Sequence, residues 1–285
     1  MADATRPFSE QSGFFNAFDH LRLYWRACLP ERPRAAIALV HGYADHSGRY
    51  LPVLHHFAGL GYAVHAFDYR GHGQSDGRRG HCDHFSDYLS DLDVFLRRVR
   101  EQSKTLPLFL LAHSHGALVA ARYALDHPEV EQLAGAILTG AYLRLAFPPP
   151  KLKVLLAKVV GRVVPFLPVG LPLDSPMLTH DEAVQKATDQ DPLYNRTTTP
   201  RWFQESNRAQ AEVLARAAEF CWPLLVLHGG ADPIAALGAA QEFEARAGST
   251  DKSIVVYDGF LHEVLDEVGC ERVWKEIADW MEKRG

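Results

Sequence analysis

A serine stands where an apolar run passes almost directly into a helical pattern, and this junction limits the possible folds more than any other stretch. Residues 107–111 form a continuous apolar run, which predicts a short buried strand, and residues 117–126 predict a helix. Ser114 lies between them, with Ala112 and Gly116 two positions away on either side. Backbones that pass so closely leave room only for small side chains. We therefore expect a sharp strand–serine–helix turn that presents the Ser114 hydroxyl beside a helix N-terminus.

Strand and helix patterns alternate on both sides of this turn. Buried strands are predicted at residues 35–40, 62–68, 133–138, 223–228 and 253–257, and helices at 85–102, 235–247 and the C-terminus. Residues 13–24 alternate apolar and polar side chains, which predicts an opening antiparallel hairpin. Repeated strand–helix units predict an α/β fold with a mostly parallel central sheet and helices on both faces.

The alternation stops between residues 141 and 221. Prolines, polar loops and two or three helical patterns replace it there. We therefore predict one core formed by residues 1–140 and 222–285, interrupted by a mainly helical insertion at 141–221.

The composition of the chain argues against nucleic-acid binding, membrane insertion and metal binding. The 285 residues carry a formal net charge of -5 without a basic face, so nucleic acid is not an expected partner. The first ten residues lack the apolar segment of a signal peptide, and no apolar run reaches the length of about 18 residues that a spanning helix needs. The four cysteines stand singly, without metal-ligand or redox spacing. We expect a reduced, cytoplasmic protein without a metal or cofactor.

Three candidate reacting groups follow three predicted strands: Ser114, Asp232 and His262. The loops after parallel strands gather at one edge of a sheet, so these side chains can converge. A serine hydroxyl becomes a useful nucleophile when an imidazole takes its proton and a carboxylate orients that imidazole. Each residue alone has an ordinary structural explanation, such as an aspartate in a turn before proline. All three in this arrangement predict nucleophilic acyl transfer.

Acyl transfer also needs hydrogen-bond donors for the oxyanion that develops on the substrate. The backbone amide of His115, directly after the nucleophile, is one candidate. The second should come from the loop after residues 35–40, where His41 and Gly42 could aim the amide of Tyr43. We expect the side chains of His41, His113 and His115 to serve packing or hydrogen bonding.

Seven segments of the chain carry a family resemblance: residues 41–50 (HGYADHSGRY), 68–75 (DYRGHGQS), 113–116, 173–175, 191–193, 229–232 and 259–263. Together they resemble the monoacylglycerol lipase and lysophospholipase group of α/β-hydrolases. The resemblance implies an α/β-hydrolase fold, in which the insertion is a cap over the active site. It also implies a Ser114–Asp232–His262 triad and an oxyanion hole made by the amides of Tyr43 and His115. Two departures are Ala112, where the usual pattern has glycine, and His115, where the group usually has methionine.

The insertion contains the most lipid-like stretch of the chain, at residues 151–167. Helical periodicity places several apolar side chains on one broad face, with basic residues on another. We expect Leu152, Val159, Val163 and Phe166 to line a pocket for one acyl chain. The face packs against the core or, in part, touches a membrane surface transiently, which would make the cytoplasmic protein peripheral to a membrane.

The expected activity is hydrolysis of a carboxylic ester of a monoacyl lipid through an acyl-enzyme. An aminopeptidase on the same scaffold is an alternative, and it would need an acidic group such as Glu205, Glu212 or Glu263 to hold the substrate amine. A general short-chain carboxylesterase and a non-enzymatic lipid-binding protein are two further alternatives. An intact triad and oxyanion loop disfavour the last, because binding alone does not need them.

Overall fold

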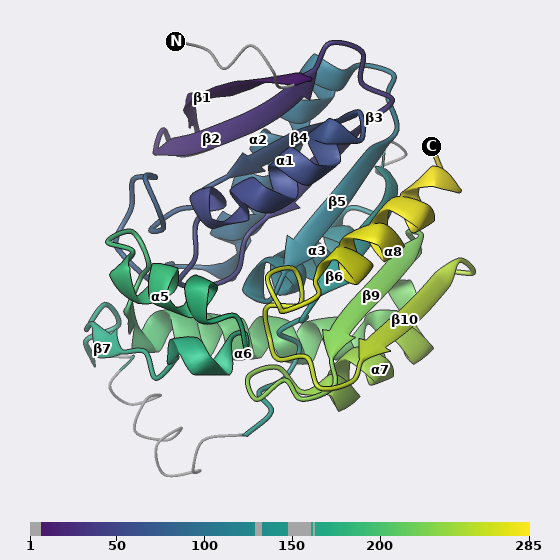
Figure 1. Cartoon of the computed structure of the whole chain (residues 1–285). Helices are drawn as coiled ribbons and strands as arrows, with labels where there is room; N and C mark the ends of the chain where they lie inside the picture. The colour runs from purple at the N-terminus through teal and green to yellow at the C-terminus, as the bar shows by residue number, and fades with distance from the viewer. Residues whose placement is uncertain (1–6, 129–132, 148–160, 162) are drawn as a thin grey trace.

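The central element of the computed structural model is an eight-stranded sheet with the strand order β1-β2-β4-β3-β5-β6-β9-β10 (Figure 1). The structure describes residues 7–128, 133–147, 161 and 163–285. The strands are β1 (Phe8–Asn16), β2 (Arg22–Pro30), β3 (Ala35–Val40), β4 (Tyr62–Phe67), β5 (Leu108–His113), β6 (Leu133–Thr139), β9 (Leu224–Gly229) and β10 (Lys252–Tyr257). The hairpin β1–β2 is antiparallel and joins β4 in antiparallel pairing, whereas the strands from β4 to β10 are parallel.

Helices cover both faces of this sheet. One face packs against α1 (Leu51–Gly59) and α8 (Glu271–Glu282), and the other against α2 (Phe85–Ser103), α3 (His115–Asp126) and α7 (Leu237–Arg246). Side chains alternate between the two faces along each strand. Ile37 and Leu39 therefore pack on the face covered by α1 and α8, whereas Ala36 and Ala38 pack on the face covered by α2, α3 and α7. Burial on both faces explains why the central strands are continuous apolar runs. The predicted α/β architecture is confirmed.

Element boundaries differ slightly from the expected ones. The opening hairpin is longer than residues 13–24, and α3 begins at His115, two residues before the predicted start. The helix begins this early because the serine turn is tighter than the apolar pattern alone reveals.

The insertion contributes α5 (Glu182–Gln190), α6 (Pro200–Ala215) and a short antiparallel pair, β7 (Val169–Gly170) with β8 (Thr197–Thr198). Among the described residues, the short 3-10 turns are η1 (Ser47–Tyr50), η2 (Ser175–Met177) and η3 (Ala217–Glu219). Figure 1 shows α5, α6 and β7 at the end of the sheet toward which the parallel strands point. Trp202 and Val213 of α6 are buried in the same core as α3. None of the helices within the described ranges is long and apolar enough to cross a bilayer.

Candidate active site

Ser114 occupies the turn between β5 and α3 in a left-handed backbone conformation, with φ 53° and ψ -116°. Only a few per cent of non-glycine residues have a positive φ, and they are concentrated at functional turns. A Cβ added to Gly116 would lie 2.4 Å from the His41 carbonyl oxygen, so only glycine fits beside that strand end. Ala112 is fully buried two residues before the serine, so its methyl group is accommodated there. The turn expected from the sequence is present.

The three groups predicted at strand ends are linked in series, with His262 within hydrogen-bonding distance of both Ser114 and Asp232. Nε2 of His262 lies 2.8 Å from Oγ of Ser114, and its Nδ1 lies 2.7 Å from Oδ2 of Asp232. Asp232 follows β9 and His262 follows β10, so the parallel sheet delivers all three side chains to one edge. His262 is buried and the Asp232 side chain has no exposed surface, which restricts the orientation of the imidazole. This arrangement can pass a proton from the serine hydroxyl to the imidazole.

The surroundings of Asp232 and His262 favour a negatively charged carboxylate beside a positively charged imidazolium. Burial alone would raise the pKa of Asp232, but the His262 ring beside it holds that pKa below its usual value. The second oxygen, Oδ1, also accepts hydrogen bonds from the amides of Ile234 (2.8 Å) and Ala235 (3.0 Å). Burial would lower the pKa of His262, yet the charge and hydrogen bond of Asp232 raise it. The carboxylate is therefore built to stabilise an imidazolium.

His228 is a partner of Asp232 that the sequence analysis missed. Its Nε2 lies 3.3 Å from Oδ2 of Asp232 and 3.1 Å from the Ala235 carbonyl oxygen. Burial lowers the pKa of His228, so the neutral ring donates its proton within this loop. Its place at the end of β9, four residues before Asp232, is the pattern that could have indicated it.

Tyr43 and His115, whose amides are expected to bind an oxyanion, border the same cavity as Ser114. His115 is the first residue of α3, where a backbone amide has no acceptor within the helix. The Tyr43 side chain fixes the facing loop, because its hydroxyl donates to the carbonyl oxygens of Gly80 and Thr197, both at 3.0 Å. The Tyr43 and Trp202 ring centroids are 3.8 Å apart. These contacts hold the loop after β3 against the insertion residues Thr197 and Trp202.

The other histidines near the turn do not compete with His262 as a base. Burial lowers the pKa of both His113 and His115 to about 3. Their rings lie near hydroxyl groups, with His113 Nδ1 3.0 Å from Thr139 Oγ1 and His115 Nε2 3.3 Å from Ser206 Oγ. Burial also lowers the pKa of His41, whose Nδ1 contacts the Gly42 carbonyl oxygen at 2.7 Å. These rings remain neutral and fill hydrogen-bonding positions, as their sequence context predicts.

Ser114 opens into a cavity of about 350 Å³ between the core and the insertion. Most of its wall is apolar: Tyr142, Leu145, Phe147, Leu171, Pro172, Leu173, Met177, Leu178, Tyr194, Trp202, Phe203, Pro233 and Ile234.

The described side chains of this wall differ from the expected ones. Val163 is 76% exposed and Phe166 is 47% exposed, and neither borders the cavity. Leu152 and Val159 lie outside the described residues. The prediction rests on the helical periodicity of apolar residues in 151–167. Leu171 and Leu173, which do border the cavity, lie in an irregular segment where the apolar residues follow no helical or strand period.

One end of the cavity is polar. Asp45 and Glu263 border it, and both bind Arg49, whose Nε lies 2.5 Å from Asp45 and whose Nη2 lies 3.0 Å from each Glu263 oxygen. The Tyr50 hydroxyl donates to Asp45 at 2.8 Å. Burial would raise the pKa of Asp45, but Arg49 holds it below its usual value, whereas burial raises the pKa of Glu263. The cavity thus joins an apolar wall to a hydrogen-bonding end beside His262.

Comparison with known proteins places this geometry in context. The Hydrolase_4 family model, described as serine aminopeptidase, S33, matches residues 31–269. A monoacylglycerol lipase of Mycolicibacterium smegmatis is 30% identical over 99% of this chain and 99% of that protein. Phospholipase YtpA of Bacillus subtilis is 30% identical over 88% of this chain and 95% of that protein. The crystal structure of a Paleococcus ferrophilus monoacylglycerol lipase has a TM-score of 0.82, 26% identity, and coverage of 97% of this chain and 100% of that one.

Proposed function

The chain belongs to the Hydrolase_4 family of α/β-hydrolases, and from that premise we propose that it hydrolyses the carboxylic ester of monoacyl lipids with Ser114 as nucleophile. The observation that carries this proposal is the hydrogen-bonded series Ser114–His262–Asp232, whose first two members border a largely apolar cavity. The lipase names of the relatives support the ester class.

The reaction proceeds in two steps. Ser114 Oγ attacks the ester carbonyl carbon while His262 Nε2 takes the hydroxyl proton, and the amides of Tyr43 and His115 stabilise the oxyanion. The intermediate collapses to an acyl-enzyme as His262 returns the proton to the leaving alcohol. Water, deprotonated by the same imidazole, then releases the fatty acid and restores Ser114.

The polar end of the cavity favours an uncharged, hydroxyl-bearing head group. The described residues of the cavity wall include the carboxylates of Asp45 and Glu263 but no lysine or arginine. Arg49 already contacts both carboxylates, so it offers no unpaired positive charge to a phosphate. Carboxylates accept hydrogen bonds from hydroxyl groups. We therefore assign a glycerol monoester in preference to an anionic lysophospholipid.

The same contacts weaken the aminopeptidase alternative, which needs a carboxylate for the substrate amine. Arg49 forms an ion pair with Glu263 at 3.0 Å, so this carboxylate can still accept a hydrogen bond but offers no unpaired negative charge to an amine. The other two candidates do not line the cavity: Glu205 accepts from the Phe85 amide at 3.0 Å, and Glu212 pairs with Arg122 at 3.0 Å.

Labelling and turnover test the proposal together. A fluorophosphonate should label wild-type protein at Ser114, and Ser114→Ala should lose both the label and the hydrolysis of monoolein. Ser103→Ala, a buried serine at the end of α2, is the matched control and should behave as wild type. Monoolein should be cleaved faster than triolein and lysophosphatidate. Labelling of another serine in active protein would refute the nucleophile, and equal rates on all three lipids would refute the substrate class.

A further inference from the structure

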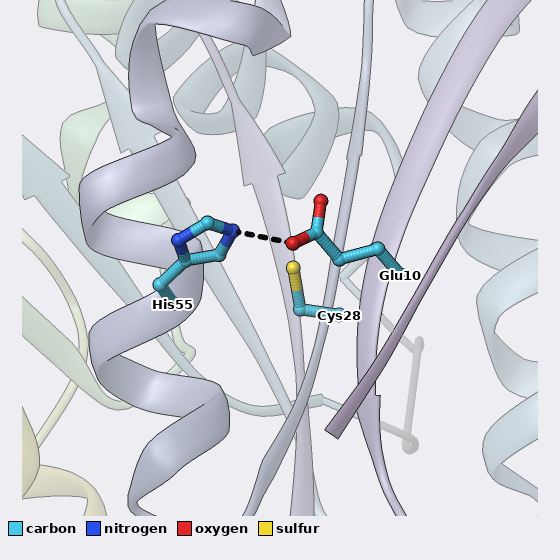
Figure 2. A group of neighbouring side chains, drawn as sticks. All are labelled: Glu10, Cys28 and His55. Atoms are coloured by element: carbon cyan, nitrogen blue, oxygen red, sulfur yellow. Dashed lines mark ion pairs between the residues drawn. The ribbon is translucent and has the colours of Figure 1, made fainter. Parts of the chain in front are cut away.

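Three separate elements bring together Glu10, Cys28 and His55 on the sheet face that α1 covers (Figure 2). Glu10 of β1 and Cys28 of β2 are direct partners in the antiparallel ladder, so their side chains leave the same face of the sheet. His55 reaches them from α1. One potential ligand atom from each residue lies within 4.8 Å of the other two.

The distances suit a shared cation. His55 Nε2 lies 3.1 Å from Glu10 Oε1, and two atoms that bind one Zn²⁺ at about 2.1 Å in tetrahedral geometry lie about 3.4 Å apart. The nitrogen is shielded from solvent, and its contact with Glu10 does not have the geometry of a hydrogen bond. The buried Cys28 supplies sulfur as the third donor. Glu10 is close to half exposed, so its carboxylate can shift to complete the geometry.

We propose that Glu10, Cys28 and His55 bind a divalent cation of the Zn²⁺ type. Thiolate, imidazole and carboxylate form a donor set that Zn²⁺ prefers over Mg²⁺ or Ca²⁺. A small cavity of about 110 Å³ borders Glu10 and Cys28 and has room for a water molecule as fourth ligand. Arg26 also borders this cavity, and Ser47 Oγ accepts a hydrogen bond from its Nε at 3.0 Å.

The site is independent of the proposed hydrolysis. None of the three residues borders the cavity that contains Ser114. A bound cation would instead tie the edge hairpin β1–β2 to α1, and any ligand that binds only the folded state adds to its stability. Spacing along one element does not reveal such a site, which is why the sequence analysis expected no metal.

Cobalt binding is the direct test, because a thiolate–Co²⁺ bond gives a charge-transfer absorption in the near ultraviolet. Untagged, chelator-washed protein should show this absorption and bind one equivalent. Cys28→Ala should abolish the absorption, while Glu10→Gln and His55→Gln should weaken binding at least tenfold. The control is Cys221→Ala, which removes an exposed free thiol and should leave the spectrum unchanged. Absence of the absorption in wild type, or its persistence in Cys28→Ala, would overturn the proposal.

Thermal unfolding supplies a second readout if Cys28→Ala does not fold. Zn²⁺ should raise the Tm of wild type and of Ser114→Ala by the same amount, and should leave the Tm of His55→Gln unchanged. An equal shift in His55→Gln would place the ion elsewhere, and no shift in wild type would leave a plain His55–Glu10 ion pair. Either result contradicts the site.

Discussion

Ser114 holds a backbone conformation that costs of order 1–3 kcal/mol for a residue with a side chain. Its surroundings enforce that conformation. The Ser114 amide donates to the Thr139 carbonyl at 2.9 Å, and Gly116 passes against the end of β3. At this turn the Ser114 hydroxyl lies 2.8 Å from Nε2 of His262, and the next residue, His115, borders the cavity. The residue with the strained backbone is therefore also the residue that we propose as the nucleophile.

Replacing Asp232 by asparagine tests the acid of the proposed triad. The base must be neutral to accept a proton, so kcat/KM falls as pH drops below the pKa of His262, which Asp232 raises above the usual 6.5. Asp232→Asn removes that negative charge, so the acidic limb of the profile should move to lower pH. The plateau should fall about 10⁴-fold, because the wrong imidazole tautomer is favoured. A pH–rate profile on a soluble ester measures both effects.

Asp258→Asn is the matched control, because this exposed carboxylate lies in the loop between β10 and His262. It should keep the wild-type profile. An inactive Asp258→Asn or Asp266→Asn beside an active Asp232→Asn would show that the acid is misassigned.

At the scale of elements, the dependence of activity on acyl-chain length tests whether the insertion contacts the acyl chain of the substrate. Leu173 borders the cavity, so Leu173→Asp should raise KM for long-chain esters about tenfold, equivalent to about 1.4 kcal/mol, and change acetate esters little. Val163→Asp lies in the same insertion but on an exposed position outside the cavity wall, and should leave both classes unchanged. Initial rates over a chain-length series provide the measurement. A larger effect at Val163 would place the chain along the outer face, where the helical pattern expected it.

The sequence predicted the parallel sheet, the serine turn and the three strand-end residues because each leaves a local pattern. A buried strand is a short apolar run, and strand ends in a parallel sheet converge by topology. The cavity wall leaves no such pattern, since Leu171 and Leu173 come from irregular chain and acquire their role only through tertiary packing. The contact between His228 and Asp232 is local in sequence, yet it depends on the turn that their loop adopts.

At the scale of the whole molecule, several contacts fasten the insertion to the loops that carry the site. The Asn195 amide donates to the Ala44 carbonyl at 2.7 Å, and the Glu263 amide donates to the Leu178 carbonyl at 2.8 Å. Nε2 of His46 lies 2.8 Å from Asp191 Oδ2. Because these contacts reach both the loop after β3 and the loop that carries His262, the insertion and the core should unfold in one cooperative transition.

The carboxylate of Glu267 also connects the insertion to the loop that carries His262. Its buried carboxylate accepts hydrogen bonds from the amides of His180 (2.8 Å), Val268 (2.9 Å) and Leu261 (3.1 Å), and from the Thr179 hydroxyl (3.2 Å). It thereby joins the insertion to the residue directly before His262. Burial alone would raise the pKa of Glu267, but these hydrogen bonds hold it below the ordinary 4.5.

Glu267→Gln should lower the free energy of unfolding at pH 7 by about 1.5–3 kcal/mol, the usual contribution of hydrogen bonds to a charged group. The depressed pKa means that the stabilisation is complete above the ordinary glutamate value of 4.5 and is lost as pH falls through the folded-state pKa. Urea unfolding at a series of pH values should therefore show the two proteins converging in acid. Glu242→Gln, which removes an exposed partner of Arg144 and Arg246, should cost less than about 1 kcal/mol. A Glu267→Gln difference that stays constant with pH would mean that packing, and not the charge, fastens the insertion to the His262 loop.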